Sequence, residues 1–154
     1  MSSSALLEWL KALGGVVALV GLAVALVTYR RSVRTRRAEW LASLHEKFFE
    51  SDRYREVRRV LDYHSEPEYL ELANAVAAGT HHPLGDELYR YLNFFELLAG
   101  LRLLGQISDE EIVGLFDYDL RLIKQHEFVA NALNPQGFER LAALLESKHF
   151  RSRS

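Results

Sequence analysis

The sequence has no cysteine, and this absence excludes disulfide bonds, iron–sulfur clusters and zinc sites built on thiolates. It also lacks a nucleophile elbow, a phosphate-binding loop, a paired-histidine zinc helix and a dinucleotide-binding fingerprint. Its six histidines are scattered and do not form a metal-ligand pattern. We therefore predict no catalytic residue, no cofactor, no bound metal and no small-molecule substrate.

Most of the chain has fewer basic than acidic residues. Beyond Arg37 the sequence has 13 basic and 20 acidic residues, which gives a net charge of −7. An acidic domain does not attract a phosphate backbone, so this composition argues against nucleic acid as a partner. The roughly 115 residues of this part suffice for one small domain with one core.

Residues 12–29 form a run of eighteen positions without a charge. A helix of this length reaches roughly 27 Å, close to the ~30 Å thickness of the hydrocarbon core of a bilayer. Trp9 and Tyr29 flank the run, as aromatic residues do at the two membrane interfaces. We interpret the run as an uncleaved transmembrane helix; a cleavable signal peptide and a buried helix of a soluble fold are the alternatives.

Charge around this run is strongly asymmetric. Before it only Lys11 is basic, and Glu8 balances that charge, whereas a signal peptide has positive charge before its apolar segment. Because basic residues near a span favour the cytoplasmic side, we predict an external N-terminus and a cytoplasmic C-terminal domain. Five arginines that follow the run carry this prediction and are also candidate contacts to lipid headgroups: Arg30, Arg31, Arg34, Arg36 and Arg37.

Small residues recur along the predicted span. Gly14, Ala18, Gly21 and Ala25 are spaced by four, three and four positions, which places them on one helix face. A face of small side chains lets a second helix approach closely, so it is a candidate packing face for a homo-oligomer or for the span of a partner protein. The alternative is that glycine and alanine are simply common in membrane helices.

The rest of the sequence predicts helices and no strand, because apolar residues recur at helical spacing in each segment. Residues 112–133 predict one long helix, and Ser108 with Glu111 forms a capping-box pattern at its start. His81 and His82 lie in a predicted loop, where neighbouring histidines rarely bind one metal ion.

We therefore predict an all-α chain with a single N-terminal transmembrane helix followed by a small cytoplasmic helical bundle. The N-terminal segment and anchor occupy residues 1–29, and a basic juxtamembrane helix occupies residues 30–50. The helical bundle domain occupies residues 51–150. We expect the anchor and the juxtamembrane segment to form one continuous helix that breaks near Ser51.

Four polar side chains lie among apolar residues at helical spacing: Asn93, Glu96, Asp119 and His126. A buried carboxylate needs a partner, so we interpret these residues as a structural polar core that fixes helix register. The alternative for Glu96 is a functional acid, which would form the centre of an enzyme together with His126.

Three short segments support a resemblance. Residues 40–49 read WLASLHEKFF, residues 91–96 read YLNFFE and residues 105–110 read GQISDE. Together with the N-terminal apolar run and its basic end, they resemble an uncharacterised family of short bacterial membrane-anchored helical proteins, filed as a domain of unknown function. The resemblance implies a bacterial inner membrane and helical architecture, and it implies no activity or catalytic residue.

These observations favour a membrane-anchored helical scaffold or accessory subunit that binds a protein partner at the cytoplasmic face of a bacterial inner membrane. The second hypothesis is a membrane-active regulator or effector whose oligomerised spans perturb the bilayer. An enzyme with an unrecognised site is the third.

Overall fold

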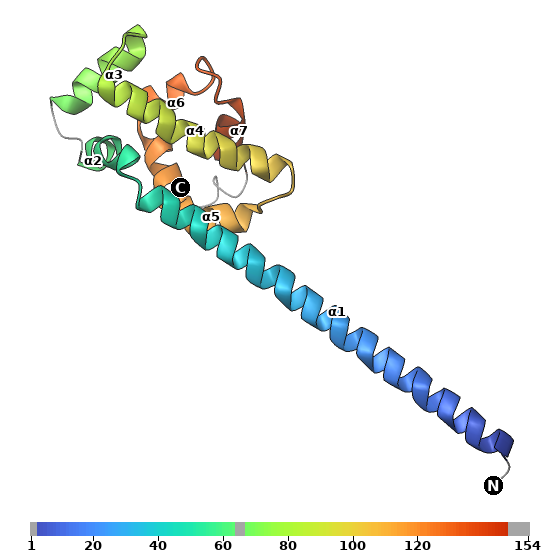
Figure 1. Cartoon of the computed structure of the whole chain (residues 1–154). Coiled ribbons are helices and arrows are strands. Elements are labelled where there is room, and N and C mark those ends of the chain that lie inside the picture. Colours follow the sequence, from blue (N-terminus) through green and yellow to red (C-terminus); the bar gives the residue numbers. More distant parts are fainter. Residues whose placement is uncertain (1–2, 64–66, 148–154) are drawn as a thin grey trace. The chain divides into compact units, whose positions relative to one another are not determined.

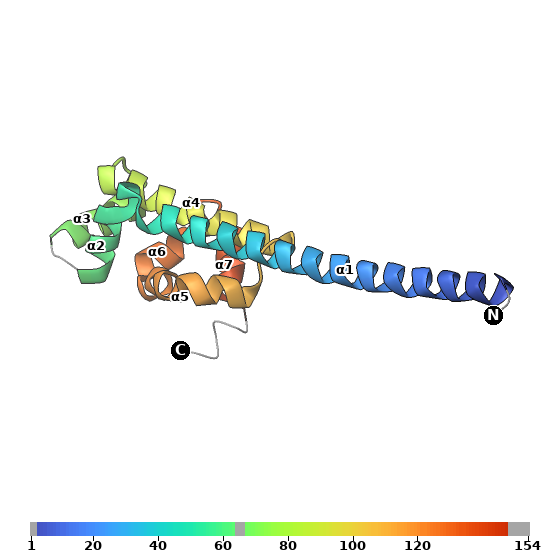
Figure 2. The ribbon, with the colours of Figure 1, turned by 60° about the horizontal axis from the view of Figure 1, so that its bottom comes forward.

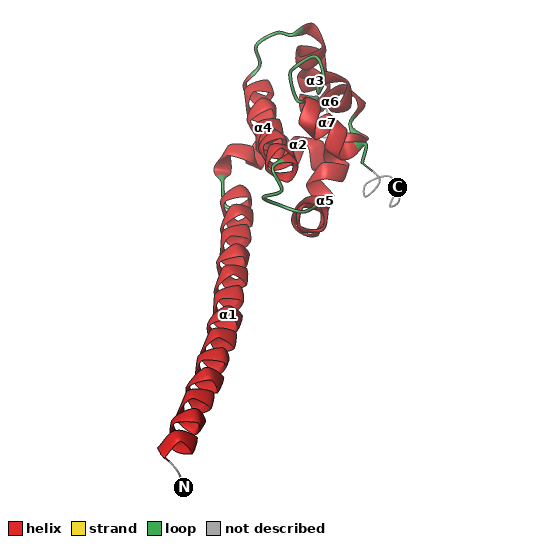
Figure 3. Ribbon diagram, turned by 90° about the vertical axis from the view of Figure 1, so that its right-hand side faces the viewer, coloured by secondary structure: helices red, strands yellow, loops and turns green. Residues whose placement is uncertain are grey.

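The computed structural model describes the backbone of residues 3–63 and 67–147, and within these ranges it leaves out the side chains of residues 3–19 and 23. Every regular element of the described residues is a helix (Figure 3), which confirms the prediction of an all-α chain. The chain divides into two compact units, Met1–Phe49 and Glu50–Ser154.

The first unit is a single helix, α1, which runs from Ser3 to Phe49 without interruption (Figure 1 and Figure 2). Its 47 residues extend over about 70 Å at 1.5 Å per residue. The predicted continuity between the apolar run and the basic segment is therefore confirmed. All described side chains from Val20 to Trp40 are exposed.

Among the residues with described side chains, no helix is both long enough and apolar enough to cross a membrane. The predicted span includes residues 12–19 and 23, whose side chains lie outside that description. The transmembrane part of the predicted fold is thus not supported by the structure and stays a prediction.

Helix α1 ends at Phe49, close to the predicted break. Ser51 has extended backbone dihedral angles (φ −73°, ψ 118°), and its hydroxyl oxygen accepts a hydrogen bond from the backbone N–H of Arg53 at 3.3 Å. This cap begins the short 3-10 helix η1 (Asp52–Tyr54), which leads directly into α2 (Arg55–Tyr63).

Five further helices are described in the second unit: α3 (Glu68–Ala78), α4 (Pro83–Leu103), α5 (Asp109–Gln125), α6 (Glu127–Ala132) and α7 (Glu139–Leu145). Helix α3 ends at Gly79, which adopts a positive φ of 65° that glycine tolerates best. The predicted capping box begins α5: the Glu111 N–H donates to Ser108 Oγ (3.2 Å), and the Ser108 N–H donates to Glu111 Oε2 (2.8 Å).

The prediction of one helix over residues 112–133 is wrong. Helix α5 stops at Gln125, because His126 has extended backbone dihedral angles (φ −88°, ψ 102°). The carbonyl of His126 then accepts hydrogen bonds from the N–H groups of Val129 and Ala130, which starts α6. At this break the imidazole of His126 is buried, with only 2% of its surface exposed.

Helix α4 is central to the second unit and packs against η1, α2, α3 and α7. Aromatic rings fill the middle of its buried face. The ring centroid of Phe95 lies 5.1 Å from that of Tyr91 and 5.9 Å from that of Phe116, both edge to face, which is a favourable geometry for aromatic pairs. Helix α6 packs against both α5 and α3.

Candidate functional site

Two stretches of the second unit contain no charged residue, in a chain of which 26% of the residues are charged. Residues 72–85 cover most of α3 and the start of α4, and residues 128–138 cover most of α6 and the turn before α7. Since α3 and α6 pack against each other, the fold combines the two stretches into one surface. We call this surface the uncharged face; the sequence analysis did not single it out.

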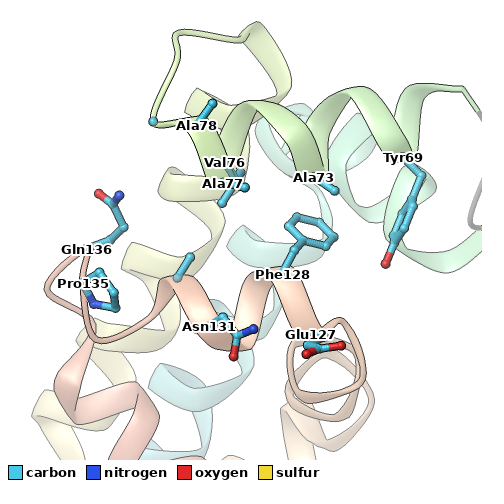
Figure 4. Close-up of a pocket in the computed structure, with 12 residues that line it drawn as sticks. Tyr69, Ala73, Val76, Ala77, Ala78, Glu127, Phe128, Asn131, Pro135 and Gln136 are labelled. Atoms are coloured by element: carbon cyan, nitrogen blue, oxygen red, sulfur yellow. The ribbon is translucent and has the colours of Figure 1, made fainter.

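A cavity of about 670 Å³ opens between α3 and α6 on the uncharged face (Figure 4). Helix α3 contributes small side chains to it, among them Ala73 and Ala77, and Phe128 of α6 extends into the space between the two helices. Pro135 and Gln136 line it after α6. We call this cavity and its lining the α3–α6 groove.

Tyr69 lines the groove at the N-terminal end of α3, where its hydroxyl lies 3.0 Å from Nδ1 of the buried His126. The Tyr69 ring also meets the ring of Phe128 edge to face, with centroids 5.3 Å apart. Burial raises the pKa of the Tyr69 hydroxyl. The pair ties α3 to the junction of α5 and α6.

A smaller cavity of about 290 Å³ shares Val76, Gly79 and Gln136 with the groove. The predicted loop histidines line it, and Nε2 of His81 lies 3.3 Å from a carboxylate oxygen of Asp86. No group of three or more histidine or carboxylate side chains is placed to hold a metal ion in the part of the chain that the structure describes.

Asp119 is buried, with 1% of its surface exposed, and its partners come from α4 and α2. The Tyr91 hydroxyl donates to Asp119 Oδ1 at 3.2 Å, and Nε of Arg58 lies 3.6 Å from the same oxygen. Burial raises the pKa of Asp119, against the opposing effects of Arg58 and Tyr91. Burial and the Asp119 charge raise the pKa of Tyr91 well above its ordinary value. This cluster joins α2, α4 and α5 inside the core.

Glu96 binds a backbone group of a neighbouring helix. Its side chain is 15% exposed, and Oε2 accepts a hydrogen bond from the backbone N–H of Leu141 at 2.8 Å, in the first turn of α7. The Arg140 guanidinium lies 3.9 Å from the other oxygen. Asn93 does not join this arrangement: its side chain is exposed, because it lies about 200° around α4 from the buried positions two residues away on either side.

Glu87, nearer the start of α4, makes the same kind of contact, and no sequence pattern predicted it. Its Oε1 accepts hydrogen bonds from the backbone N–H groups of Glu56 and Val57, both at 3.1 Å, in the first turn of α2. Glu87 and Glu96 are nine residues apart, which is about two and a half turns, so they point to opposite sides of α4. Each carboxylate thereby caps a helix that packs on a different side of α4.

The residues predicted to meet lipid and other helices belong to α1. Gly14 and Ala18 lie outside the described side chains, whereas Gly21 and Ala25 are exposed. A Cβ atom added at Gly21 would meet no described atom within 4 Å. The five arginines of residues 30–37 are exposed as well.

Comparison with family models, curated proteins and solved structures gave no match for the chain.

Proposed function

We propose that the chain is a membrane-anchored helical scaffold or accessory subunit that binds a protein partner through its uncharged face. The single observation that carries this proposal is the convergence of two charge-free stretches around the α3–α6 groove. The sequence favours a protein-binding role, and the uncharged face is the surface that we assign to this role.

Charge depletion is the compositional mark of the centre of a protein–protein interface. A buried charge without a partner is costly, so a surface that is to be covered by another protein is best built from uncharged side chains. Small side chains such as Ala73 and Ala77 add a second advantage, because they let the backbone of a partner approach α3 closely. The groove is also preformed, since Tyr69 and His126 hold its two sides together.

The membrane anchor is part of the same proposal. Apolar side chains of α1 are well exposed, including Leu22 (69%), Val24 (59%) and Val27 (63%). Apolar surface in contact with water is unfavourable by about 25 cal/mol per Å², and lipid would remove this cost. Exposed arginines follow immediately, which supports a cytoplasmic second unit at a bacterial inner membrane with the N-terminus outside.

Co-purification in mild detergent tests the proposal. Ala77→Arg places a charge inside the groove, at an exposed helical position where the domain tolerates a long side chain. Ala143→Arg is the matched control, because Ala143 is also exposed and helical but lies on α7. We expect Ala77→Arg to release the partner protein and Ala143→Arg to retain it. Equal retention by the two variants would contradict a binding role for the uncharged face.

A further inference from the structure

We infer that the α3–α6 groove binds an extended, uncharged peptide segment of the partner protein, with a basic residue accepted only beside Glu127. This inference rests on the proposed function and names the chemistry of the segment that the groove would take.

The charges that line the groove determine which charges a bound segment can carry. Glu127 is the one charged side chain among the described residues that line the cavity. A carboxylate or ammonium group laid elsewhere along the groove would lose its hydration and gain no counter-ion. The exposed carboxylate of Glu127 at the start of α6 offers a counter-ion for a lysine or arginine at that end.

The length of α3 sets the length of the segment. Helix α3 has 11 residues and is about 16 Å long at 1.5 Å per residue. Extended chain advances about 3.3 Å per residue, so roughly five residues cover the length of α3.

The polar side chains of the groove favour an extended segment over a helix. Asn131 and Gln136 line the cavity from the α6 side, and both are exposed. Each amide offers two donors and an acceptor. A helix satisfies its own backbone groups, whereas an extended segment presents free N–H and C=O groups that such amides bind. The small floor of Ala73 and Ala77 opposite Phe128 leaves room for one bulky apolar side chain of the segment.

Phage display of random twelve-residue peptides on the full chain in detergent tests this inference. We expect selected peptides to have an uncharged apolar centre of about five residues and, where they carry charge, a lysine or arginine at one end. Synthetic copies should bind the full chain, lose at least tenfold in affinity on Ala77→Arg and keep their affinity for Ala143→Arg. Glu127→Gln should weaken only the peptides with a basic end.

Two further measurements keep the test decisive. Asn131→Leu leaves charge unchanged and should weaken binding severalfold by removing an amide that binds the peptide backbone. Circular dichroism should show no helix gained by the bound peptide. Selected peptides with acidic centres, peptides that become helical on binding, or the absence of any peptide that distinguishes Ala77→Arg from Ala143→Arg would each overturn the inference.

Different results would contradict the proposed function and the inferred chemistry of the bound segment. If the partner is lost from Ala77→Arg but its bound segment is helical or charged, the proposed function stands and the inference falls. If peptides of the expected kind bind the groove while the partner is retained by Ala77→Arg, the proposed function falls.

Discussion

Removal of the Glu96 carboxylate should destabilise helix α7. In Glu96→Ala the backbone N–H of Leu141 loses its 2.8 Å hydrogen bond to a charged acceptor. Hydrogen bonds to charged groups contribute about 1.5–3 kcal/mol, and loss of a helix cap costs about 1 kcal/mol. The 3.9 Å contact with Arg140 adds little, because the Arg140 side chain is 61% exposed. We therefore expect a loss of about 2 kcal/mol.

Hydrogen exchange measured by mass spectrometry on the full chain reads this loss directly. A change of about 2 kcal/mol in the opening free energy corresponds to roughly 30-fold faster exchange, which we expect in the segment that covers α7. Glu96→Gln keeps an oxygen acceptor without the charge and should give an intermediate value.

Asn93→Ala is the control for this prediction, because Asn93 lies on the same helix with an exposed side chain. It should change the stability by no more than about 0.5 kcal/mol. Unchanged exchange of α7 in Glu96→Ala, or equal acceleration in both variants, would refute the assignment of Glu96 as a cap for α7.

Burial raises the folded-state pKa of Asp119 above 3.8. The stability gained from its bound proton is therefore fully present below pH 3.8 and is lost as the pH rises through the folded-state pKa. Unfolding free energies of wild type and Asp119→Asn between pH 3 and 7 should show this loss in wild type alone. Glu87→Ala should cost about 1–2 kcal/mol and accelerate exchange in the first turn of α2, while exchange in α7 stays unchanged. Gly21→Leu should weaken crosslinking between spans in native membranes, whereas Val27→Leu, about 120° around α1 from Gly21, should not. Equal crosslinking by the two variants would remove the small-residue face as a packing surface.

The sequence predicted those features of the fold that depend on neighbouring residues. Helical periodicity identified an all-α chain, and the capping box of Ser108 and Glu111 is present because both partners lie within one turn. The continuity of α1 and its end near Ser51 also depend on local signals. Burial of Asp119 and His126 followed from their apolar neighbours on the helix.

Contacts between distant residues could not be predicted in this way. Glu87 and Glu96 each bind a backbone N–H group at least thirty positions away in sequence, and no local pattern predicts such a cap. The break at His126 falls within an apolar periodicity that continues on both sides. The uncharged face existed in the sequence as two separate stretches, and only the packing of α3 on α6 gives them a common surface. A scan for charge-free stretches in a charged chain would have found both.

Site-specific photocrosslinking in native membranes tests the central claim most directly. A photoreactive amino acid at Ala77 reports on the α3–α6 groove, and the same amino acid at Ala143 reports on an exposed helical position outside it. Binding through the uncharged face predicts a discrete protein adduct at Ala77 and none at Ala143. Adducts of equal yield at the two positions, or an adduct at Ala143 alone, would contradict it.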